Sequence, residues 1–125
     1  MQTNQKHYCS NPTFSESEVL SIIKNLDYCN DNKDTILVVL KSIKNEEQIL
    51  RLSSIANKRV FFKKILNLCL LQKCKRFILI KTTDFLITPK IKEEIRQDAL
   101  ILKEASHSID LEFEGFILIC TNCKT

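Results

Sequence analysis

Two uninterrupted apolar runs of strand length, separated by a capped helix, most constrain the fold of this 125-residue chain. The runs are residues 77–80 and 116–119, both reading FILI. Such runs are typical of central strands that are covered on both faces. Between them, Thr88 can cap a helix with its hydroxyl, and Pro89 occupies the first helical position, where an N–H has no partner within the helix. The stretch therefore predicts a strand, a loop, a helix and then two further strands.

The upstream sequence adds a helix, a hairpin and a second helix. Ser15 followed by Glu18 is a capping box, with Phe14 and Val19 placed as its hydrophobic staple. Residues 35–40 (TILVVL) are rich in β-branched side chains and predict a strand, and residues 48–53 predict the returning arm of a hairpin. Asn57 is placed to cap a helix over residues 58–72.

This order of elements predicts an α/β fold with a single mixed central sheet flanked by about three helices. The chain is short enough to be one domain. Residues 1–13 carry no periodicity and predict a flexible N-terminal leader, residues 14–120 the domain, and residues 121–125 a C-terminal tail.

Composition excludes several classes of function. Gly115 is the single glycine, whereas a phosphate-binding loop needs several glycines, so a dinucleotide or P-loop enzyme is excluded. No apolar run approaches the roughly 18 to 20 residues that span a bilayer, and the polar N-terminus lacks the apolar core of a signal peptide. The sequence therefore predicts a cytoplasmic protein without a membrane partner. A formal net charge of +4 does not specify nucleic acid.

Four segments, taken in order, resemble the RadC family, the bacterial branch of the JAB/MPN metalloprotease fold. They are the hairpin TILVVLKSIKNEEQI, the helix NKRVFFKKIL, the strand RFILI and the run LKEASHSIDLEFEGFILI. The resemblance covers roughly residues 15–119 and implies one RadC-like JAB/MPN domain. Members with the metalloprotease motif carry H-N-H-P-S-G and then a serine and an aspartate. Two histidines and the aspartate would hold zinc, while a glutamate acts as general base.

The chain departs from the family where that chemistry would lie. The positions of the two histidines fall on Lys81 and Thr83, or on Thr82 and Asp84, and the acidic position near the first strand is retained as Asp34. Zinc prefers nitrogen and sulfur ligands, which this loop does not offer. The resemblance therefore implies a pseudoenzyme without a cofactor that binds a protein partner of unknown identity. The exposed sheet edge and the basic second helix are the surfaces to test.

A nucleic-acid interface is the first alternative, and RadC proteins carry a historical DNA-repair label. Basic residues gather around the predicted second helix, namely Lys58, Arg59, Lys63, Lys64, Lys73, Lys75 and Arg76. Phosphate contacts need such clusters, and Phe61 and Phe62 lie among them. Helical spacing, however, places at least Phe61 on the buried face, which makes the lysines the solvated side of an amphipathic helix.

A zinc-dependent hydrolase with rearranged ligands is the second alternative. Cys120 and Cys123 form a C-x-x-C pair, which can supply half of a zinc site. The remaining ligands would come from Cys69, Cys74, Cys9 or His7, but the spacing brings no second C-x-x-C pair. The simpler interpretation is that these cysteines are free thiols, as is usual in a cytosolic chain.

Overall fold

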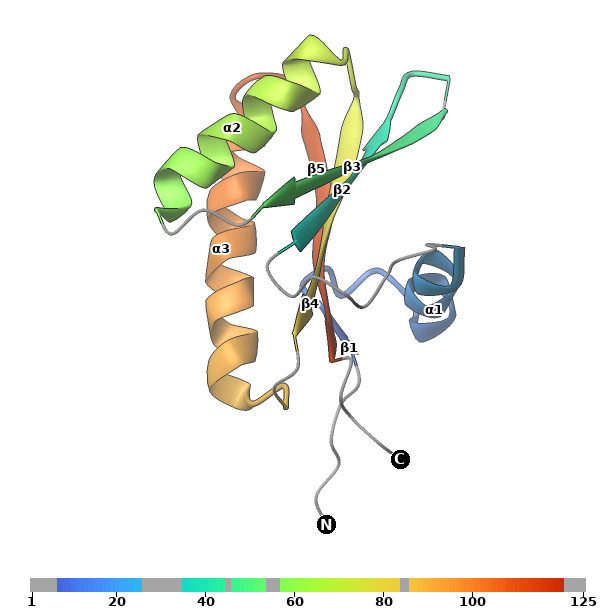
Figure 1. Cartoon of the computed structure of the whole chain (residues 1–125), viewed down its shortest axis with the longest axis vertical. Coiled ribbons are helices and arrows are strands. Elements are labelled where there is room, and N and C mark those ends of the chain that lie inside the picture. The colour runs from blue at the N-terminus through green and yellow to red at the C-terminus, as the bar shows by residue number, and fades with distance from the viewer. Residues whose placement is uncertain (1–6, 26–34, 45, 54–56, 84–85, 121–125) are drawn as a thin grey trace.

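The computed structural model describes residues 7–25, 35–44, 46–53, 57–83 and 86–120. Within these residues, five strands form one mixed sheet that three helices accompany (Figure 1). In chain order the elements are β1 (His7–Cys9), α1 (Glu16–Asn25), β2 (Thr35–Lys41), β3 (Glu47–Ser53), α2 (Lys58–Leu71), β4 (Arg76–Thr83), α3 (Pro89–His107) and β5 (Glu112–Cys120). The predicted α/β class with a mixed sheet and three helices is confirmed.

The strand order in the sheet is β1-β5-β4-β2-β3. The two apolar runs lie at its centre, where β4 pairs with β5 in parallel and α3 makes the crossover between them. The predicted hairpin is present as β2 and β3, and β2 also pairs antiparallel with β4. The hairpin therefore joins the parallel pair through β2 and leaves β3 at the edge of the sheet.

Both faces of the sheet are covered, which explains the continuous apolar runs. Alternate strand residues such as Phe77 and Leu79 pack with Ile65 of α2 and Leu102 of α3, and all four are 0% exposed. Their neighbours on the strands form a second core with Val19 of α1, made up of Leu37, Val39, Ile78, Ile80, Ile117 and Ile119. Figure 1 shows α2 and α3 together on one side of the sheet and α1 on the other.

All three predicted helix starts are confirmed. Ser15 and Glu18 form the reciprocal capping box, in which the Glu18 N–H donates to Ser15 Oγ at 3.1 Å and the Ser15 N–H to Glu18 Oε1 at 2.9 Å. Asn57 Oδ1 accepts from the Val60 N–H at 3.2 Å, and Thr88 Oγ1 accepts from the Ile91 N–H at 3.3 Å. Each cap satisfies a backbone donor that has no partner inside its helix.

The structure differs from the predicted end of the chain, where two strands were expected after α3. A single strand, β5, runs through the whole segment, and a bulge in its pairing with β4 lies at Glu114 and Gly115. A Cβ on Gly115 would lie 3.2 Å from the Asn11 Cβ and 3.5 Å from Cys9 Sγ. The glycine therefore permits a close approach of the N-terminal segment, and the expected turn does not form.

The structure also differs from the predicted leader at β1. His7–Cys9 pairs antiparallel with β5. Ser10 extends this pairing, because its N–H donates to the Phe116 carbonyl at 3.0 Å and its Oγ accepts from the Phe116 N–H at 2.9 Å. Three residues are too few to show a period, so only their partner strand specifies them. Residues 1–6 and the predicted tail, 121–125, lie outside the described part of the chain.

Among the described helices, none is long and apolar enough to cross a membrane.

Candidate functional site

The positions that correspond to the family's metal loop lie at the end of β4. Lys81, Thr82 and Thr83 are half-buried there and pair in register with residues 118–120 of β5. Asp34 and Asp84 lie outside the described residues. In the part of the chain that the structure describes, no group of three or more His, Cys, Asp or Glu side chains is gathered as a metal ion would require.

No three of the cysteines and histidines proposed for a rearranged zinc site lie together among the described residues. Cys120 is buried and takes part in a disulfide bond, so the prediction of a free thiol is wrong for this residue. Cys123 lies outside the described residues. Cys9, Cys69 and Cys74 are free thiols.

Helix α2 presents a mixed basic and apolar surface to solvent. It buries Phe61, Phe62, Ile65 and Cys69 against the sheet. On the opposite side of the helix, exposed residues recur at helical spacing. We name this surface the α2 outer stripe, and it consists of Val60, Lys63, Lys64, Asn67, Leu70 and Leu71. Its apolar members are well exposed, Val60 by 51%, Leu70 by 49% and Leu71 by 76%. Such exposed apolar side chains grouped on one helix are typical of an interaction surface.

The candidate nucleic-acid contacts Lys58, Arg59, Lys63, Lys64, Lys75 and Arg76 do not form one surface. Arg59, Lys63 and Lys64 are exposed on α2, whereas Lys58 is held by Asp98 of α3, with Nζ 3.2 Å from Oδ2. Lys75 is exposed after the helix, and Arg76 is half-buried at the start of β4. Phe61 and Phe62 are 4% and 9% exposed, so neither ring is available to stack on a base.

The charge around α2 is nevertheless one-sided. Residues 57–83 include eight lysines or arginines and no aspartate or glutamate, whereas the whole chain has 19 basic and 15 acidic residues. The remainder of the chain is therefore net acidic. This segregation gives the α2 outer stripe a positive potential, which favours an acidic partner.

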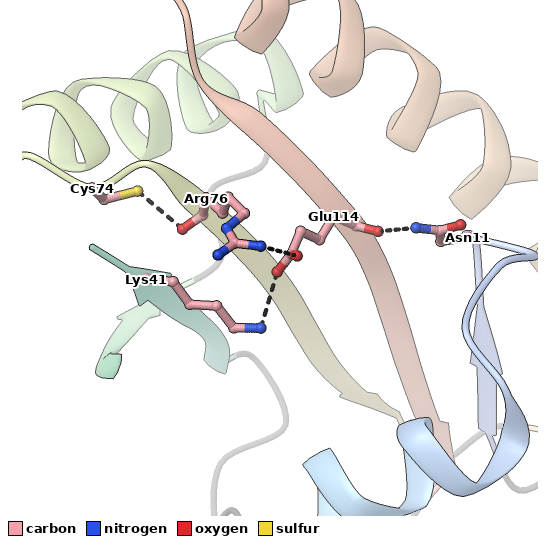
Figure 2. A network of polar contacts seen from close by, with 5 residues as sticks. All are labelled: Asn11, Lys41, Cys74, Arg76 and Glu114. Atoms are coloured by element: carbon pink, nitrogen blue, oxygen red, sulfur yellow. Dashed lines mark hydrogen bonds and ion pairs between the residues drawn. The ribbon is translucent and has the colours of Figure 1, made fainter. Parts of the chain in front are cut away.

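A carboxylate network that the sequence did not predict links three strands at the end of the sheet where β4 and β5 begin (Figure 2). Glu114 lies at the bulge of β5, with Oε1 3.1 Å from Lys41 Nζ and Oε2 3.7 Å from Arg76 Nη1. The contact between Lys41 Nζ and Glu114 Oε1 is an ion pair but not a hydrogen bond, because its angles are unsuitable. The Glu114 carbonyl also accepts from Asn11 Nδ2 at 2.6 Å. Glu114 is thus neutralised by two cations, which makes it a structural link between β2, β4 and β5.

A pocket of about 500 Å³ lies between the β1 segment, α3 and the first half of β5. Arg96 and Lys103 lie at its α3 side, and Glu93 fixes Arg96 with two hydrogen bonds of 3.0 and 2.6 Å. Tyr8 and Cys9 line the opposite side, and burial raises the pKa of both. Both groups are therefore neutral near neutral pH, so neither is an activated nucleophile.

Sequence reasoning missed Glu114 because an isolated acidic residue in an alternating strand predicts solvent exposure. The bulge turns it toward Lys41 and Arg76 instead. It also missed the proximity of Cys69 and Cys74, which depends on the backbone conformation at the end of α2.

A scan against protein-family models finds no matching family, and no curated protein matches the chain. The functional inference therefore rests on the residues of this chain.

Proposed function

We propose that this chain is a non-catalytic, RadC-like JAB/MPN module that binds a partner protein through the α2 outer stripe. The partner segment would be acidic and partly apolar. The family assignment rests on the residues that resemble RadC proteins, and it is supported by the succession of hairpin, helix, strand, helix and strand over Thr35–Cys120. The degenerate metal loop has Lys81 and Thr83, or Thr82 and Asp84, at the histidine positions, which supports a binding role over zinc chemistry.

The single observation that carries the proposal is the combination of charge and apolar area on α2. Lys63 and Lys64 lie on either side of the exposed Val60, Asn67 and Leu71. A surface that served only to attract phosphate would need cations alone. Exposed leucines next to lysines instead fit an amphipathic acidic segment, whose apolar side chains cover the leucines while its carboxylates approach the lysines.

A photo-crosslinking residue in place of Asn67, in the middle of the stripe, identifies the partner in cells. The purified partner is then titrated against two double variants, Leu70→Ser/Leu71→Ser and Lys63→Glu/Lys64→Glu. We expect each to weaken binding by about tenfold or more, as loss of about 1.4 kcal/mol or more would do. Leu100→Ser/Ile101→Ser is the matched control, because it removes exposed apolar side chains from α3. Equal affinity for all three variants would overturn the proposal.

The charge segregation of residues 57–83 favours nucleic acid as the second candidate. The same variants separate the two functions, with a fluorescent DNA duplex and a single strand as probes. Nucleic-acid binding predicts loss with Lys63→Glu/Lys64→Glu, little change with Leu70→Ser/Leu71→Ser, and affinity that falls steeply with salt. Binding that is insensitive to salt, or that is lost with the leucines, would exclude it.

A further inference from the structure

Helix α2 ends in a cap that brings two cysteines together. The Cys74 N–H donates to the Cys69 carbonyl at 2.9 Å, and the Lys73 N–H donates to the Leu70 carbonyl at 3.1 Å. Lys73 has a φ of 55°, in the left-handed region. These are the two hydrogen bonds and the backbone conformation of the Schellman motif, with Gln72 as the C-cap. In this motif the third residue from the helix end and the second residue after the cap are in contact, and here both are cysteines.

The two thiols differ in exposure. Cys69 is 0% exposed within the core, whereas Cys74 is half-buried at the protein surface. The Cys74 Sγ lies 3.2 Å from the Arg76 carbonyl, to which the thiol form donates (Figure 2). Solvent and small molecules therefore reach Cys74 first, and Cys69 lies behind it.

The surroundings of Cys74 also favour its ionised form. A hydrogen bond from the Cys69 side chain is the largest cause that lowers the pKa of Cys74, and backbone contacts at Lys41 and Arg76 act in the same direction against desolvation. The same contact raises the pKa of Cys69. The neighbours in sequence, Lys73 and Lys75, add positive charge. A partly exposed thiol among cations is the usual environment of a reactive cysteine.

We propose that Cys69 and Cys74 form a reactive thiol pair that exchanges with small-molecule disulfides, with Cys74 as the attacking residue and Cys69 as the resolving residue. The Cys74 thiolate attacks one sulfur of the disulfide, which forms a mixed disulfide and releases one thiolate. Cys69 then loses its proton to solvent and attacks the Cys74 sulfur, which releases the second thiolate. Two protein thiols are oxidised to one disulfide, and one small disulfide is reduced to two thiols.

This pair is independent of the α2 outer stripe, but it lies at the same end of the helix as Leu70 and Leu71. Cys9 provides an internal comparison, because it is a free, half-buried thiol without a neighbouring cysteine among the described residues, and burial raises its pKa. The proposal therefore predicts different chemistry at two thiols of similar exposure.

The test uses oxidised glutathione with the purified full chain, followed by intact mass and peptide mapping. The wild type is expected to lose two hydrogens without a lasting adduct and to yield a peptide crosslinked between Cys69 and Cys74. Cys69→Ser should accumulate a glutathione adduct on Cys74, because no thiol resolves it. Cys74→Ser should react at least tenfold more slowly, and Cys9→Ser should behave as the wild type.

Two results would overturn the proposal. One is a stable glutathione adduct on Cys74 in the wild type without the Cys69–Cys74 crosslink, and the other is an unchanged rate in Cys74→Ser. Circular dichroism establishes that each variant is folded. As a second measurement that needs no variant, brief alkylation of the native wild type should label Cys74 before Cys9, and the reverse order would also reject the proposal.

Discussion

Replacing Glu114 with glutamine tests whether the carboxylate network stabilises the fold. The substitution keeps the shape of the side chain and removes its charge, and with it the ion pairs that Glu114 makes with Lys41 and Arg76. At an effective dielectric constant of about 20, charges separated by 3.1 and 3.7 Å attract by about 5 kcal/mol each before desolvation. The side chains of Glu114, Lys41 and Arg76 are 13%, 21% and 33% exposed, so desolvation and solvent screening offset much of this attraction.

We expect Glu114→Gln to lower the free energy of unfolding by about 2 kcal/mol, between the values typical of exposed and buried ion pairs. In urea this shifts the midpoint by about 1 M. Glu112→Gln is the matched control, because Glu112 is exposed on the same strand, and we expect it to change stability by less than about 0.5 kcal/mol. Combining Glu114→Gln with Lys41→Met gives the coupling energy in a double-mutant cycle. A midpoint for Glu114→Gln equal to that of the control would refute the reasoning.

Three further predictions concern the β1 contact, a helix cap and a thiol. Gly115→Ala should lower the free energy of unfolding by about 1–2 kcal/mol, because the new methyl group lies 3.2 Å from the Asn11 Cβ. Amide hydrogen exchange should become faster mainly over residues 7–11, and unchanged exchange there would contradict the assigned contact. Thr88→Ala should cost about 1 kcal/mol in urea unfolding, whereas Thr88→Ser should retain most of the cap. The pKa of Cys74 is lowered, so alkylation of Cys74 should reach half its maximal rate below the pH of about 8.5 that is usual for a thiol. In Cys69→Ala, which removes the hydrogen-bond donor, this midpoint should rise, and an unmoved midpoint would contradict the assigned cause.

The sequence predicted those elements whose local signals agree with their environment. The caps at Ser15, Asn57 and Thr88 are short-range features, and each forms the predicted hydrogen bond. The two FILI runs predicted buried central strands because both faces of the sheet are covered. The mixed sheet followed from the order of the elements.

Features that depend on distant partners were not predictable in the same way. β1 becomes a strand because β5 offers it an edge, and its own three residues carry no signal. Two strands were predicted after the second of the long helices, yet Gly115 lies within one continuous strand and next to Asn11. Helical spacing predicted the burial of Phe61, and the packing of α2 shows that Phe62 is buried as well. The proximity of Cys69 and Cys74 depends on a left-handed backbone at Lys73, a conformation that a lysine in the sequence does not predict.

The pairing of β1 with β5 has a consequence for how the molecule assembles. His7 lies opposite Ile119, so this contact closes a loop of more than a hundred residues, while the β2–β3 hairpin closes a short one. Loop closure of that length carries a large entropic cost, so we expect β1 to dock last during folding and to detach first near native conditions. Whenever it detaches, the edge of β5 becomes open to any strand of suitable sequence, including β1 of another copy. Exchange of β1 between molecules is therefore the route by which this fold would form dimers at high concentration.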